Sequence, residues 1–155
     1  MNMNFGSVDE ILNFAIDREK EAVAFYASLA EQATRDSLKQ TFVGFSKEEE
    51  KHVSLLSDIS GNKEKIDAYE FKPVTDLKIS DYMVEKEYEE GMPMPEILKL
   101  AMKREEKAVK LYGSLAAQTD NADAKKVFEI LVQEESKHKL GLESLYDDYL
   151  ADQDN

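Results

Sequence analysis

The sequence predicts an all-α protein, an antiparallel four-helix bundle made of two αα-hairpin repeats joined by a long crossover. Three observations support this fold class. Glycine and proline are scarce, with 6 and 3 residues in a chain of 155, as is typical of helical proteins. Apolar residues recur three and four positions apart, as they do on one face of a helix. Finally, a segment of the first half occurs again in the second half.

The repeat aligns residues 10–59 with residues 96–145 without a gap, at an offset of 86 residues. Twenty of the 50 aligned pairs are identical, far more than two unrelated acidic helices would share. Both copies contain the pattern Arg-Glu-x-x-Ala-Val-x-x-Tyr, starting at Arg18 and at Arg104. The chain therefore carries the same two-helix unit twice.

A chain of this length with 42% hydrophobic residues can bury one globular core. We expect a single domain over residues 1–155. Its first repeat covers residues from about 7 to 61, a crossover linker covers residues 62–93, and the second repeat covers residues from about 94 to 150. Short turns inside each repeat make its two helices antiparallel neighbours.

The first helix is expected to begin near Ser7, because Ser7 and Glu10 have the spacing of a capping box. It should run to about Ala33. The second helix should begin around Asp36 and stop at Gly61, a residue suited to a left-handed helix cap.

The crossover is long enough to run the height of a bundle, and a short helix is expected within it at Ser80–Tyr88. Its aromatic residues, such as Phe71, are expected to cover the core. In the second repeat, Pro95 fits the first turn of a helix. A turn at Thr119–Asn121 should precede the last helix, which ends near Leu150.

The two histidines of the chain share one local pattern. His52 lies three residues after Glu49, and His138 lies three residues after Glu135. Residues three apart share a helix face, so each pair can direct a carboxylate and an imidazole toward one metal ion.

The partner helix of each repeat carries a glutamate within its apolar stripe. Glu19 lies on the stripe with Tyr26, and Glu105 lies on the equivalent stripe with Tyr112. A carboxylate on a core-facing position is costly unless it is paired or binds a metal. The recurrence in both repeats favours metal binding.

Bringing the two hairpins together would converge four carboxylates and two imidazoles, as in ferritin-like dimetal proteins. The predicted ligands are Glu19, Glu49, His52, Glu105, Glu135 and His138. This oxygen and nitrogen donor set suits iron or manganese, with zinc as a competitor. Glutamates beside the motifs, Glu106 among them, face other directions and are expected to be solvated.

These motifs resemble the rubrerythrin branch of the ferritin-like superfamily over nearly the whole chain except the linker. The resemblance implies a site with two iron ions, bridged by Glu49 and Glu135. It implies terminal ligation by two pairs of residues, Glu19 with His52 and Glu105 with His138. It also implies that Tyr26 and Tyr112 donate hydrogen bonds to metal-bound carboxylates, so that the catalytic residues are Glu49, Glu135, Tyr26 and Tyr112.

Two features differ from rubrerythrins proper. The chain has no cysteine and therefore no rubredoxin domain, and Ala108 occupies the position of a further glutamate that those proteins carry. Electrons must then come from an external donor such as a rubredoxin-like protein. The leading hypothesis is a di-iron oxidoreductase that reacts with O2 or hydrogen peroxide, in oxidative stress or iron handling. The alternatives are an iron-binding or storage ferritin-like protein, and a metal-binding homologue without catalysis.

The formal charge of −13 opposes binding to nucleic acid or to an anionic membrane surface, because phosphate contacts need clustered Lys and Arg. The sequence shows neither a membrane-spanning apolar run nor the basic and apolar segments of a signal peptide. A cytoplasmic location is expected. A monomer or homodimer would favour the redox enzyme, whereas a hollow multi-subunit shell would favour storage.

Overall fold

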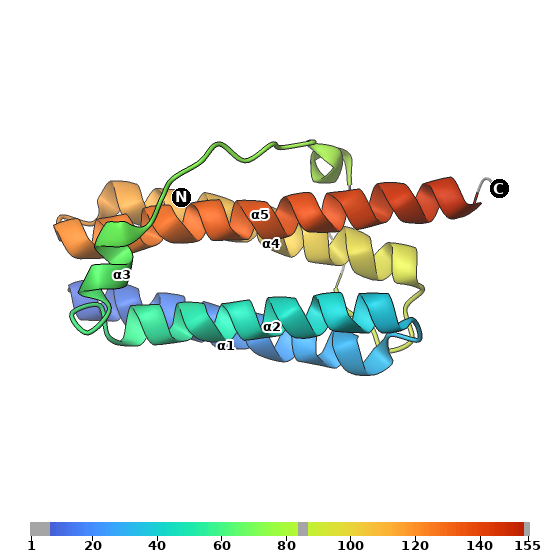
Figure 1. Cartoon of the computed structure of the whole chain (residues 1–155), viewed down its shortest axis with the longest axis horizontal. Helices are drawn as coiled ribbons and strands as arrows, with labels where there is room; N and C mark the ends of the chain where they lie inside the picture. Colours follow the sequence, from blue (N-terminus) through green and yellow to red (C-terminus); the bar gives the residue numbers. More distant parts are fainter. Residues whose placement is uncertain (1–6, 84–86, 154–155) are drawn as a thin grey trace. The chain divides into compact units, whose positions relative to one another are not determined.

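The computed structural model describes residues 7–83 and 87–153, and these residues form helices and turns without any strand. The elements are α1 (Val8–Gln32), α2 (Asp36–Ser57), α3 (Lys63–Ala68), a 3-10 helix η1 (Ile79–Tyr82), α4 (Met94–Gln118) and α5 (Ala122–Gln153). The predicted fold class is confirmed: the chain is all-α, and its four long helices form two hairpins (Figure 1). Within the described residues, no helix is both long and apolar enough to cross a membrane.

The chain divides into two compact units. Among the described residues, the first comprises 7–69 and 115–128, and the second comprises 70–83, 87–114 and 129–153, so that α4 and α5 each contribute to both.

The first unit is built on the hairpin of α1 and α2, which pack against each other (Figure 1). The predicted start of α1 is confirmed, because the Ser7 hydroxyl accepts a hydrogen bond from the Glu10 amide at 3.2 Å. The apolar stripes of the two helices supply buried residues such as Ala15, Leu29 and Phe42. Burial of these stripes, more than intrinsic helix propensity, stabilises the hairpin.

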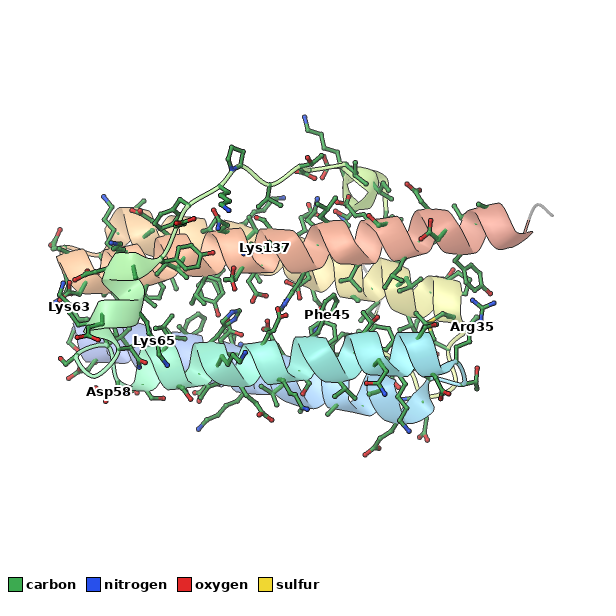
Figure 2. All side chains as sticks on the ribbon, in the orientation of Figure 1. Arg35, Phe45, Asp58, Lys63, Lys65 and Lys137 are labelled. Atoms are coloured by element: carbon green, nitrogen blue, oxygen red, sulfur yellow. The ribbon has the colours of Figure 1, made fainter. Side chains whose placement is uncertain are left out.

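The second helix ends earlier than the sequence indicated. It stops at Ser57, and Gly61 lies in the following turn, where its amide donates a hydrogen bond to the Asp58 side chain at 2.9 Å. The prediction of Gly61 as the helix cap is therefore wrong. Asp58 competes as a turn former because its short carboxylate satisfies a nearby backbone amide. Figure 2 shows Arg35 and Asp58 at the two ends of α2.

A short helix that the sequence analysis missed, α3, follows this turn. Ile66 is its buried anchor, and Lys63 forms ion pairs with Asp67 at 3.3 Å and with Asp123 at 2.9 Å. These residues are all part of the first unit. These ion pairs are exposed, so the burial of Ile66 contributes most of the free energy that holds α3 in the first unit.

In the second unit, the crossover runs beside α5 and hydrogen-bonds to it (Figure 1). The helix predicted at Ser80–Tyr88 is wrong in type and extent, because only the 3-10 helix Ile79–Tyr82 forms and residues 84–86 lie outside the described residues. Phe71 is 47% exposed, so the expectation that it covers the core is wrong. In place of a regular helix, this part of the crossover has hydrogen bonds from its backbone amides to side chains of α5.

The starts of the last two helices agree with the sequence analysis. Pro95 lies in the first turn of α4, where its missing amide leaves no hydrogen bond unmade. The predicted turn at Thr119–Asn121 is present, and the Asn121 side chain caps α5 by accepting a hydrogen bond from the Ala124 amide at 2.9 Å. The last helix continues to Gln153, three residues beyond the predicted end.

Candidate metal centre

The first unit gathers three of the predicted ligands into one buried group, the first half-site (Glu19, Glu49 and His52). Glu19 comes from α1, whereas Glu49 and His52 lie three residues apart on one face of α2. Nδ1 of His52 is 3.6 Å from Oε1 of Glu19 and 3.5 Å from Oε1 of Glu49. The hairpin thus brings Glu19 of α1 next to Glu49 and His52 of α2, so that two carboxylates and an imidazole meet.

The second unit repeats this arrangement as the second half-site (Glu105, Glu135 and His138). Glu105 lies on α4, and Glu135 and His138 lie three residues apart on α5. Nδ1 of His138 is 3.6 Å from Oε1 of Glu105 and 3.9 Å from Oε1 of Glu135. The same residue types in the same order therefore produce the same local geometry twice.

The donor chemistry of each half-site fits a metal ion. In both, the side chains are buried, and each offers one ligand atom within 4.8 Å of the others. Two buried carboxylates in one place are costly without a compensating cation. Carboxylate oxygens with an imidazole nitrogen are suitable ligands for iron, manganese or zinc. The ligand roles of the six residues stay a prediction.

The two tyrosines assigned to catalysis are both buried, with 1% of their surfaces exposed. Tyr26 lies in an aromatic cluster of the first unit, with ring centroids 5.3 Å from Phe25, 5.3 Å from Phe45 and 6.4 Å from Phe42. Edge-to-face and offset arrangements of this kind are favourable. Packing thus fixes the Tyr26 ring. The hydrogen bonding of both hydroxyls to metal carboxylates stays a prediction.

Glu106 differs from the expectation that glutamates beside the motifs are solvated. Only 12% of its side chain is exposed, and its two oxygens pair with Lys103 at 2.9 Å and with Lys110 at 3.0 Å. Burial raises the pKa of Glu106, but the hydrogen bonds from both lysines outweigh it and lower the pKa to about 2. Glu106 is therefore an anion fixed between two cations on the flank of α4.

Sequence analysis also missed a row of polar side chains on α5 that hold the crossover. The Gln133 side chain accepts a hydrogen bond from the Lys72 amide at 2.6 Å, and the Glu143 carboxylate accepts one from the Ile79 amide at 2.9 Å. Lys139 forms an ion pair with Asp76 at 2.5 Å. All three side chains are buried. The available signal was a difference between the repeats, because the equivalent residues of the first repeat are Lys47, Ser57 and Val53.

Comparison with known proteins places these half-sites in a wider context. A family model described as Rubrerythrin matches residues 10–146, a range that includes both half-sites. A solved structure named "Hypothetical Protein Pfu-1136390-001 From Pyrococcus furiosus" is similar, with a TM-score of 0.67 and 28% identity over 94% of this chain and 92% of that chain.

A second solved structure shares the fold alone. It is named "CopM in the Cu(I)-bound form" and has a TM-score of 0.60 and 12% identity over 89% of this chain and 94% of that chain. No curated protein matches the sequence.

Proposed function

The chain belongs to the rubrerythrin family, and on this premise we propose that its two half-sites form one centre for two iron ions. The observation that carries the proposal is the duplicated, buried set of two glutamates and a histidine. Each half-site contributes three ligands, and Glu49 and Glu135 are proposed to bridge the metals, as the resemblance implies. Manganese and zinc are the competing metals.

We propose that the protein is an oxidoreductase that reduces O2 or hydrogen peroxide. When held by these residues, two ferrous ions would supply the two electrons that the reduction of the oxidant requires. The protein's own residues then have three tasks: the carboxylates and imidazoles fix the ions, the apolar stripes exclude water, and Tyr26 and Tyr112 orient the carboxylates. Reducing equivalents come from an external donor such as a rubredoxin-like protein, because the chain has no cysteine.

Metal loading is the first test. Ferrous iron added anaerobically should load about two ions per chain. Glu49→Ala and Glu135→Ala should each reduce this loading. The matched controls are Glu50→Ala on α2 and Glu129→Ala on α5, because both of these glutamates are exposed. Unchanged loading in Glu49→Ala and Glu135→Ala would disprove the assignment.

The reaction is the second test. The iron-loaded protein is mixed in a stopped-flow instrument with O2 and, separately, with hydrogen peroxide, and the faster reoxidation identifies the oxidant. Repeated turnover with reduced rubredoxin would support an enzyme. Accumulation of much more iron than two ions per chain, together with a large hollow assembly on sizing, would support storage instead. Loading without reoxidation by either oxidant would support the homologue without catalysis.

A further inference from the structure

A serine ties the two helices of the first hairpin together close to the first half-site. The hydroxyl of Ser46 on α2 donates a hydrogen bond to the carbonyl oxygen of Val23 on α1 at 2.9 Å. Ser46 is buried and lies one turn before Glu49, and Val23 lies one turn after Glu19. The bond therefore fixes the separation of α1 and α2 where their carboxylates approach His52.

Phe45, the residue next to Ser46, strengthens the same contact between α1 and α2. The ring of Phe45, labelled in Figure 2, meets Tyr26 edge-on with centroids 5.3 Å apart, and the ring of Phe42 stacks with Tyr26 at 6.4 Å. Edge-to-face and stacked ring pairs stabilise the contact between the helices beyond the area that they bury. The hydrogen bond of Ser46 and the aromatic cluster around Tyr26 thus both stabilise the contact between α1 and α2 beside the first half-site.

The second repeat lacks the hydroxyl and two of the rings of this arrangement, although Tyr112 and Phe128 are retained. The residue equivalent to Ser46 is Val132, which has no hydroxyl, and those equivalent to Phe25 and Phe45 are Leu111 and Leu131. There the polar side chains of α5, such as Lys139 and Glu143, bond instead to the crossover. The two half-sites therefore have the same ligands but different supports.

We infer that Ser46 is a positioning residue for the metal bound by the first half-site and makes that position the tighter of the two. The inference rests on the proposed function, because it concerns the same dimetal centre. A ligand set that is held in place before binding loses less conformational entropy when the metal arrives. A neutral hydrogen bond of ordinary strength corresponds to about a fivefold change in the dissociation constant.

The experiment measures each position by itself with cobalt(II), which gives a visible absorption spectrum and resists oxidation. His138→Ala weakens the second half-site and reports on the first, and His52→Ala does the reverse. Cobalt(II) chloride is titrated into each full-length variant in competition with a chelator. The expected result is a dissociation constant about fivefold lower in His138→Ala than in His52→Ala.

Ser46 is then changed in both backgrounds. In His138→Ala, Ser46→Val and Ser46→Ala should weaken cobalt binding about fivefold and alter the absorption spectrum, whereas Ser46→Thr should retain both. In His52→Ala, the same changes should leave binding unaltered. The matched control is Ser57→Ala, because the Ser57 hydroxyl bonds to the Val53 carbonyl within α2 at 2.7 Å and does not reach another helix.

Two results would overturn the inference. One is equal or weaker cobalt binding in His138→Ala than in His52→Ala. The other is an effect of Ser46→Ala that is the same in both backgrounds, which would mean a general loss of fold, to be checked by circular dichroism. If the unmodified protein binds no cobalt and no iron, the proposed function itself fails. If it binds two equivalent ions, only the present inference fails.

Discussion

Glu49 and Glu50 are neighbours in the sequence and have opposite environments. Glu49 is fully buried beside His52, and Glu50 is exposed on the same helix. A step of one residue turns the side chain by about 100° around the helix axis. At this scale, a single position decides whether a carboxylate faces water or a metal ligand set.

Residue packing beside the site gives the first prediction. Phe42→Ala should lower the free energy of unfolding by about 3–5 kcal/mol, because Phe42 is fully buried and its ring stacks near Tyr26. Urea denaturation followed by circular dichroism measures this change. Phe71→Ala is the matched control and should shift stability by no more than about 0.5 kcal/mol, since Phe71 is 47% exposed. Equal effects of the two changes would contradict the core position of Phe42.

The grouping of the predicted ligands could be read from the sequence because two local signals agree. Glu49 and His52 have helix-face spacing, and Glu19 interrupts an apolar stripe. The structure brings these three together. Ser46 and Lys139 could not be recognised in this way, because their partners are backbone atoms or residues of the crossover, whose path has no periodic pattern.

At the scale of elements, start signals were more informative than stop signals. Ser7 and Asn121 cap their helices with their own side chains, a local property that the sequence displays. The end of α2 depends on Asp58 and on the docking of Ile66, which is a tertiary contact. The six residues of α3 are too few for a helical pattern to stand out.

The helix start at Ser7 gives the second prediction. Ser7→Ala should destabilise the protein by about 1 kcal/mol, because it removes the acceptor of the Glu10 amide. Ser7→Asp keeps an acceptor and should preserve stability. Denaturant midpoints of the three proteins, at equal slopes, provide the measurement. A midpoint for Ser7→Ala equal to that of the unmodified protein would show that the cap contributes nothing.

The crossover gives the third prediction, a dependence on pH. The hydrogen bond from Lys139 holds the pKa of Asp76 below its ordinary value of 3.8. Because the pKa of Asp76 is lowered on folding, the stability that its ion pair contributes is fully present above pH 3.8. It is lost as the pH falls through the pKa of Asp76 in the folded protein. Attachment of the crossover to α5 should therefore weaken in strong acid.

Hydrogen exchange of the Ile79 amide, which bonds to Glu143, reports on this attachment. Its protection should fall at acid pH in the unmodified protein. Asp76→Asn should show reduced protection already at neutral pH and a smaller acid response. Asp81→Asn, which changes an exposed acid in the same segment, is the control. Unaltered protection in Asp76→Asn would disprove the role of the ion pair.

For the whole molecule, the negative charge and the burial of carboxylates both oppose folding until cations are bound. The formal charge is −13, and each half-site buries two of the carboxylates that contribute to it beside a histidine. Self-repulsion of this kind destabilises a compact state, and bound cations offset it. Stability of the fold and occupancy of the metal site should therefore change together.

Metal removal gives the fourth prediction. Dialysis against a chelator should lower the melting temperature, and adding back ferrous iron without oxygen should restore it. A ligand present at 1,000 times its dissociation constant stabilises the folded state by about 4 kcal/mol. Magnesium at equal concentration is the control for charge screening and should restore much less. If iron and magnesium act alike, the half-sites do not bind iron specifically.

The polar row on α5 limits how far the chain could be made symmetric. A designer who copied the first repeat over the second would keep every proposed metal ligand, since the ligand positions coincide. The copy would, however, place Lys, Val and Ser where Gln133, Lys139 and Glu143 now hold the crossover. The duplicated hairpin has thus become specialised, with one copy serving as the dock for the segment that joins them. A fully symmetric version would need a new connection as well as a second copy.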